Sequence, residues 1–308
     1  MGFPVYPPKC ERSELNDIIY FMPYYIYAWI GAVASGLIVI TAKLTSKHSI
    51  SNPWFFNFLL VLVTLFFTIP PALIYKAGLP VSWLPIVLAA IFSTLFNIFW
   101  IFSTYALDVS VLAPLFNFRA VFAVIIGGLF LNESLTSHQM SFVLIILIAG
   151  ILASMDEKFS LRSFFKRSTI IGLFTMLFLA SSGAFIKISL VKNSLWTNNL
   201  WIAIINAIFL IPTATLFYKD LKKIKISYIL PIGAMGILST ITEFSANIAY
   251  GVNLGISSLI MNTPFSMIIA FLFSIFAPKL LEKHSLKIYA IRFTATFIMI
   301  YCAIQLTV

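Results

Sequence analysis

The sequence predicts an all-α, polytopic membrane protein with ten transmembrane helices, and two observations carry this prediction. Of 308 residues, 61% are hydrophobic and only 10% are charged, whereas a soluble domain has about 45–50% apolar and about 25% charged residues. The chain therefore has too few charges to coat a water-facing surface, and much of its surface must face lipid. The apolar runs are about 20 residues long and do not alternate, which favours helices over the strands of a barrel.

Ten apolar segments, bounded by charges, Pro or Asn, define the predicted spans. They cover residues 25–44, 54–75, 83–107, 109–131, 139–155, 168–191, 196–217, 228–252, 254–280 and 286–306. Prolines and acidic residues interrupt residues 1–24, so we expect a short polar lead-in there rather than a signal peptide. A basic linker, residues 156–167, then separates a first five-helix repeat, residues 25–155, from a second, residues 168–308.

Matching landmarks recur in the two halves at a nearly constant offset of 143 to 145 residues. The pairs are Tyr75 with Tyr218, Tyr105 with Tyr250, Asn117 with Asn262, and Lys43 with Lys187. Five spans per half is an odd number, so the second half must enter the membrane in the opposite sense to the first. The sequence therefore predicts two inverted repeats, an architecture that offers the two related arrangements that alternating access needs.

Residues 108–153 carry a further pattern, in which an apolar helix is followed by the turn Leu131-Asn132-Glu133 and by Gly150 in the next helix. A weaker copy in the second half has Pro264 and the pair Leu281-Glu282. The pattern resembles the EamA repeat of the drug/metabolite transporter superfamily, and the resemblance extends over residues 25–306. Arg119 departs from it, because the family usually has Pro at that position. The resemblance implies a carrier of amino acids or other metabolites that works as an exporter.

Arg119 and Glu243 are the two ionisable residues near the middle of a span. Each costs about 2.5–3.5 kcal/mol at a helix centre on insertion scales. One interpretation is a substrate or coupling site, in which Glu243 exchanges a proton. The other is a structural ion pair that joins the halves, and the sequence leaves both open. Lys43 and Lys187 lie near span ends, where we expect structural roles and side chains that reach the interface.

Polar residues form a stripe on each of two spans at helical spacing. The stripes are Gly236, Thr240, Glu243, Asn247 and Tyr250 in the eighth span, and Thr94, Asn97, Ile101 and Thr104 in the third. They predict a shared wet cavity between the repeats; the alternative is hydrogen bonding across a dry helix contact. Trp100 is deep enough to line such a cavity or to face lipid. The predicted binding or coupling residues are Arg119, Glu243, Asn97, Asn117, Asn247, Tyr250, Asn262 and Trp100.

Other function classes receive little support. The net charge of +10 lies mostly in short loops, and there is no basic helix that would indicate nucleic-acid binding. The chain has no phosphate-binding loop and no His-Glu-x-x-His motif, so we expect no ATP, cofactor, metal or enzymatic activity. The expected partners are a small-molecule substrate, the lipid bilayer and, as a coupling ion, protons. A non-transporting receptor or scaffold with a transporter-like fold is the alternative to a secondary transporter that exports or exchanges metabolites, and we place either in the cell membrane.

Two arguments on orientation conflict. The loops after the odd-numbered spans hold 13 Lys and Arg residues, and the opposite side holds five. Because basic residues concentrate on the cytoplasmic side, this count places both termini outside. The family resemblance implies termini in the cytoplasm instead. We favour the charge count, because the difference is large and every loop is short.

Overall fold

The computed structural model describes residues 22–107, 109, 112, 115–131, 136–154, 167–222, 226–261, 263, 265–276 and 286–305. Within these residues every regular element is a helix, as the sequence predicts. Most of the predicted lead-in and of the basic linker lies outside the described residues.

The helices follow the predicted spans closely. The first half contains α2 (Tyr24–His48), α3 (Pro53–Ile74), α4 (Trp83–Ala106), α6 (Asn117–Phe130) and α7 (Ser137–Ser154). The second half contains α9 (Arg167–Ser189), α10 (Leu195–Leu210), the 3-10 helix η1 (Ile211–Leu216), α11 (Tyr218–Leu221), α12 (Ile226–Val252), α13 (Leu254–Met261), α14 (Phe265–Phe276) and α15 (Leu286–Gln305).

Six segments of the described chain are long and apolar enough to cross a membrane. They are α2, α3, α4, α9, Leu195–Leu216 and Tyr228–Val252. Val121–Phe130 and Ser137–Leu152 are shorter apolar helices. The number of ten spans therefore stays a prediction, although a helix lies within each predicted segment.

The ninth predicted span is not one continuous helix, which corrects the sequence interpretation. Residues 254–280 were expected to form a single span, whereas α13 ends at Met261 and α14 begins at Phe265. Thr263 N donates to Ile260 O at 3.0 Å, and Phe265 N donates to Thr263 O at 2.8 Å. These are short-range bonds of a turn, and the sequence has a proline at residue 264, which cannot donate a helical hydrogen bond.

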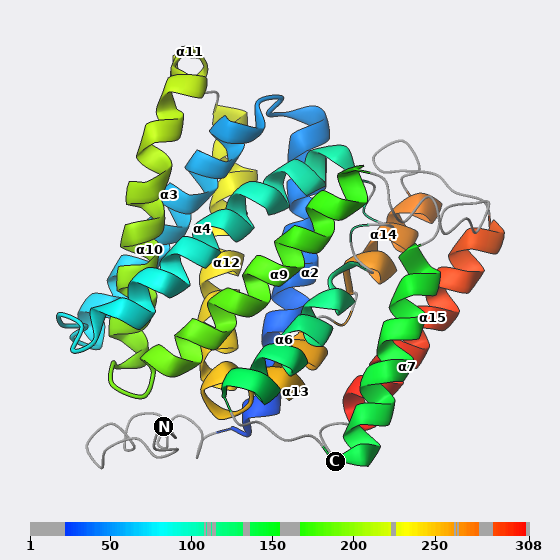
Figure 1. The fold of residues 1–308 in the computed structure, drawn as a ribbon. Coiled ribbons are helices and arrows are strands. Elements are labelled where there is room, and N and C mark those ends of the chain that lie inside the picture. Colours follow the sequence, from blue (N-terminus) through cyan, green and yellow to red (C-terminus); the bar gives the residue numbers. More distant parts are fainter. Residues whose placement is uncertain are drawn as a thin grey trace.

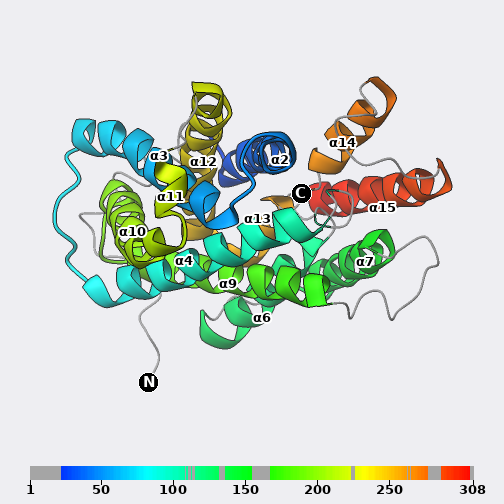
Figure 2. The same cartoon turned by 90° about the horizontal axis from the view of Figure 1, so that it is seen from above.

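The helices pack in pairs that join the two halves. The two most extensive pairings are α4 with α9 and α2 with α12. Figure 1 shows α3 and α10 at one side of the bundle and α7 and α15 at the other, and the contacts within both pairs agree with that view. Seen from above in Figure 2, α4 and α9 lie in one layer, and α2 and α12 lie in the next.

Two glycines allow helices to approach closely. A Cβ on Gly36 of α2 would lie 2.8 Å from Phe265 Cβ and 3.0 Å from Ser266 N, so α2 rests directly on the start of α14. A Cβ on Gly236 of α12 would lie 2.4 Å from Val63 Cγ1 of α3. Small residues at such contacts are typical of membrane helices, since close backbone approach supplies the packing energy.

Two lysines hold helix ends. Lys43 Nζ donates to Thr104 O at 3.0 Å and to Leu107 O at 2.6 Å, at the C-terminus of α4. Lys187 Nζ donates to Val252 O at 3.2 Å, at the C-terminus of α12. Lys43 is only 9% exposed, so it does not extend to the interface as expected. It satisfies carbonyls that a helix end leaves without partners, and its charge complements the helix dipole.

One end of the bundle is joined by the loop between α3 and α4, which we call the 78–82 loop. Asn193 Oδ1 accepts from Val81 N at 2.8 Å and Ser82 N at 3.2 Å, and its Nδ2 donates to Ser82 O at 3.0 Å. Trp201 Nε1 donates to Gly78 O at 2.9 Å. The 78–82 loop belongs to the first half and its partners belong to the second.

The opposite end is joined by contacts of the N-terminal part of α3 with Phe217 and α11. Asn52 Nδ2, which precedes α3, donates to Asp220 Oδ2 of α11 at 2.7 Å. The ring of Phe217 lies 5.7 Å from that of Phe55 and 5.0 Å from that of Phe58, centroid to centroid. The two halves are therefore connected at both ends.

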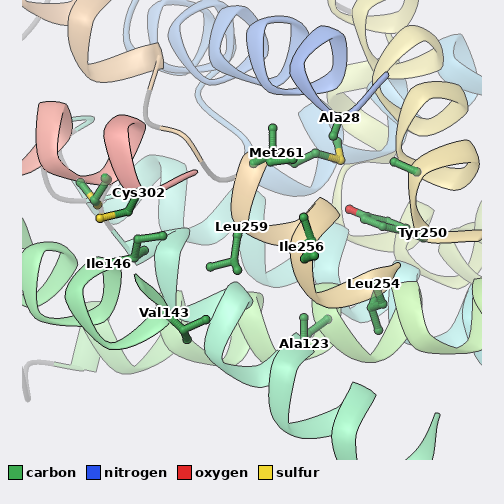
Figure 3. Packing of buried hydrophobic residues seen from close by; sticks show 14 of the residues in the cluster. Ala28, Ala123, Val143, Ile146, Tyr250, Leu254, Ile256, Leu259, Met261 and Cys302 are labelled. Carbon is green, nitrogen blue, oxygen red and sulfur yellow. The ribbon is translucent and has the colours of Figure 1, made fainter. Parts of the chain in front are cut away.

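A buried apolar cluster surrounds α13. Figure 3 shows Leu254, Ile256, Leu259 and Met261 of α13 among side chains from several helices, with Tyr250 at the edge of the group. This packing fixes the C-terminal end of α12, where Tyr250 lies.

Candidate functional site

A cavity of about 170 Å³ lies between the two halves. Its wall is formed by side chains of α2, α3, α4, α6, α9, α10, α12 and α13. Six of the eight predicted site residues line it, namely Arg119, Glu243, Asn97, Asn247, Tyr250 and Trp100. The other two predicted residues cannot be assigned to the cavity. Asn117 is the first residue of α6, but its side chain is not among the described parts of the structure, and Asn262 lies outside the described residues.

Arg119 reaches the cavity from α6, and none of the described acidic residues pairs with it. Its side chain is 5% exposed, and its Nε is buried with no hydrogen-bond partner among the described residues. The guanidinium carbon lies 5.0 Å from the centroid of the Tyr250 ring, within the range of a cation–π contact. The Tyr250 hydroxyl is also buried, and no described residue forms a hydrogen bond with it. The described residues thus present a cation on an aromatic face at one part of the cavity wall.

Glu243 lies on the same face of α12 as Tyr250 and is exposed to the cavity. Within the described residues no ion pair joins it to Arg119, so the structural pair considered from the sequence is not present there. Glu243 and Asn199 also line a second pocket, together with Thr68 and Pro71 of α3 and Phe244. Glu243 therefore lies where two hollow regions of the protein meet.

The polar stripe of α12 divides into three parts. Glu243, Asn247 and Tyr250 line the central cavity. Thr240 lines the second pocket, and Gly236 forms the close contact with α3. Helical spacing predicts which residues share a face of α12, but the packing of neighbouring helices determines which of those residues line a cavity.

The stripe of α4 is mostly packed rather than hollow. Asn97 lines the cavity, whereas Ile101 is fully buried in a hydrophobic cluster. The hydroxyls of Thr94 and Thr104 donate to Ala90 O at 2.8 Å and Trp100 O at 2.9 Å. These bonds lie within α4, so the alternative interpretation, hydrogen bonding across a dry helix contact, fits Thr94 alone, whose hydroxyl also lies 2.9 Å from Asn206 Oδ1 of α10.

Trp100 faces the protein rather than lipid. Its side chain is 5% exposed and borders the cavity, and its ring centroid lies 6.4 Å from that of Phe96. The two aromatic side chains give the cavity an apolar wall on the α4 side.

Two asparagines of α10 are site residues that the sequence analysis missed. Asn206 Oδ1 accepts from Thr94 Oγ1 at 2.9 Å, and its Nδ2 donates to Ser93 Oγ at 2.9 Å. Asn199 Oδ1 accepts from Asn247 Nδ2 of α12. The two asparagines are seven residues apart in an apolar span, so they share one helix face. The seven-residue spacing was the feature of the sequence from which a polar face on this helix could have been predicted.

The described residues contain no group of three His, Cys, Asp or Glu side chains that could hold a metal ion. The chemistry of the described cavity is therefore hydrogen bonding, one cation, one carboxyl group and aromatic contact. Such a site can bind and orient a small polar molecule.

The first half of the chain is similar to a known protein family. Residues 22–155 match the EamA-like transporter family. A solved crystal structure shares the fold, with a TM-score of 0.64 and 12% sequence identity, over 90% of this chain and 96% of that chain. No curated protein matches the chain significantly. The family match and the six apolar helices identify an integral, multi-pass membrane protein.

Proposed function

We propose, from the EamA-like transporter domain at residues 22–155, that the chain is a secondary transporter that moves small metabolites, amino acids among them, by alternating access. Export or exchange is the direction that the family resemblance favours. The observation that carries the proposal is the cavity between the halves, which is lined by Arg119 and Glu243, two ionisable residues within apolar segments that we propose to span the membrane. Ionisable groups are rarely placed there unless they serve a pathway or a ligand.

The same proposal includes an inverted repeat. The helix contacts come in exchanged pairs: α4 packs on α9 as α2 packs on α12, and α3 packs on α12 as α4 packs on α10. Lys43 reaches the carbonyl of Leu107, and Lys187 reaches that of Val252, at offsets of 144 and 145 residues. Because equivalent residues make equivalent contacts, the two halves can exchange roles when the carrier opens to the other side.

In this mechanism Glu243 is the proton site and Arg119 holds an acidic group of the substrate. A neutral Glu243 accompanies one access state and a charged one accompanies the other. Among the residues that line the described cavity, Arg119 is the one permanent cation. Proton release from Glu243 therefore changes the net charge of the residues that line the cavity, and with it the preference of the cavity for charged ligands.

The test is Glu243→Gln, which keeps the shape of the side chain and removes its charge. Purified protein in liposomes would be given a pH gradient and a panel of labelled amino acids and organic acids. We expect the variant to lose pH-driven flux while its thermal unfolding stays close to that of the parent. Lys222→Gln, at an exposed position after α11, is the control that should transport normally.

Normal pH-driven flux in Glu243→Gln would contradict the proton role. Binding of a ligand without flux under any gradient would favour the alternative, a receptor or scaffold with a transporter-like fold.

A further inference from the structure

The two charged groups of the cavity lie at separate places along α12. Glu243 and Tyr250 are seven residues apart, which corresponds to about 10 Å along a helix axis. Arg119 lies over the Tyr250 ring, so the cation marks the Tyr250 end and the carboxyl group marks the other. Asn247 lies between them, and Asn199 of α10 holds its amide.

Neither charged group forms an ion pair with another of the described residues. Arg119 Nε and the Tyr250 hydroxyl are buried donors without partners in the described residues, and Glu243 makes no ion pair there. A buried charge without a partner is costly, which applies to Arg119, whereas Glu243 is exposed to the cavity. Unpaired groups of opposite sign in one cavity therefore indicate complementary groups on a ligand, an anion at Arg119 and a cation at Glu243.

We propose that the substrate is an elongated zwitterion, with a carboxylate at one end and an ammonium or guanidinium group at the other. One amino-acid backbone unit spans about 3.5 Å. An ordinary α-amino acid with an apolar side chain therefore cannot place its two charges at both sites. A longer ω-amino acid or a short linear peptide can. The aromatic wall at Phe96 and Trp100 suits the apolar stem between the two charges.

This inference rests on the proposed function but is tested by binding alone. Thermal unfolding of the purified full-length protein would be measured with straight-chain ω-amino acids, from glycine to aminooctanoate. Hexanoate and hexylamine serve as ligands with one charge. We expect the midpoint concentration for protection to fall about ten-fold or more from glycine to the longer members, because each charged hydrogen bond contributes that ratio or more.

The variants identify which end binds which group. Arg119→Gln should remove protection by every carboxylate, and Glu243→Gln should make aminohexanoate no better than hexanoate. The length series on the unmodified protein needs neither variant to fold. Equal protection by glycine and aminooctanoate, or protection by no member of the series, would overturn the inference. Length-dependent protection without flux in liposomes would leave the inference standing and refute transport.

Discussion

Two variants of Tyr250 can distinguish the contribution of its aromatic ring, which contacts Arg119, from that of its hydroxyl group. Tyr250→Phe keeps the ring under the guanidinium and removes a hydroxyl that has no partner in the described residues. We expect its melting temperature to stay near that of the parent. Tyr250→Leu removes the ring and should lower the melting temperature, since a desolvated cation–π contact contributes about 2 kcal/mol. Thermal unfolding in detergent measures both. Equal damage from both variants would show that the hydroxyl binds a group of its own.

At the scale of single helices, the two lysines at helix ends provide a matched pair. Lys43→Met leaves two buried carbonyls of the α4 terminus without their donor. We expect a loss of about 1.5–3 kcal/mol, as for hydrogen bonds to charged groups. Lys187→Met removes a donor whose bond to Val252 O is longer, 3.2 Å, and whose side chain is only partly buried. Its melting temperature should therefore fall less. A larger effect at Lys187 would show that the second half depends more on this contact than its geometry indicates.

The contact of α12 with α3 gives a second prediction for single helices. Gly236→Ala places a Cβ 2.4 Å from Val63 Cγ1, so the helices must move apart and the protein should unfold at lower temperature. Gly233→Ala, one turn earlier on α12, meets nothing within 4 Å. It should be neutral or stabilising by up to about 1 kcal/mol, because alanine favours the helix. An unchanged melting temperature of Gly236→Ala would show that α3 can move away from α12 at this point at little energetic cost.

For the whole molecule, the distribution of Lys and Arg residues predicts the orientation in the membrane, with both termini outside the cell. The 78–82 loop and α11 lie at opposite ends of the bundle (Figure 1). In a Cys10→Ser background, we expect Leu79→Cys to react with a membrane-impermeant maleimide on intact cells and Lys222→Cys to react only after permeabilisation. Both positions are exposed, and Cys302 is buried. The reverse pattern would show that the family resemblance predicts orientation better than the basic residues do.

The helices could be predicted from sequence because lipid imposes their length and composition on each segment independently. The break between Met261 and Phe265 was missed, although the sequence has Pro264 there, because the apolar run continues on both sides of the proline and predicts one uninterrupted span. Arg119 and Glu243 were predictable as site residues because charge is rare at membrane depth. Their lack of mutual pairing was not predictable, since it depends on Arg119 resting on Tyr250, a contact between halves that no local pattern encodes. Asn199 and Asn206 were overlooked because asparagines in an apolar span are equally typical of hydrogen bonding at a helix contact.

The hydrogen bonds between Asn193 and the 78–82 loop have a consequence for how the protein behaves on cooling. If access switches at that end, several hydrogen bonds and the Trp201 contact with Gly78 must break together before the loop can leave its partners. Each bond has a large enthalpy even where its net contribution to stability is only about 1 kcal/mol. Turnover should then have a high activation enthalpy and slow sharply at low temperature, long before the fold itself is affected. Flux measured over a range of temperatures would show this as a steep Arrhenius slope.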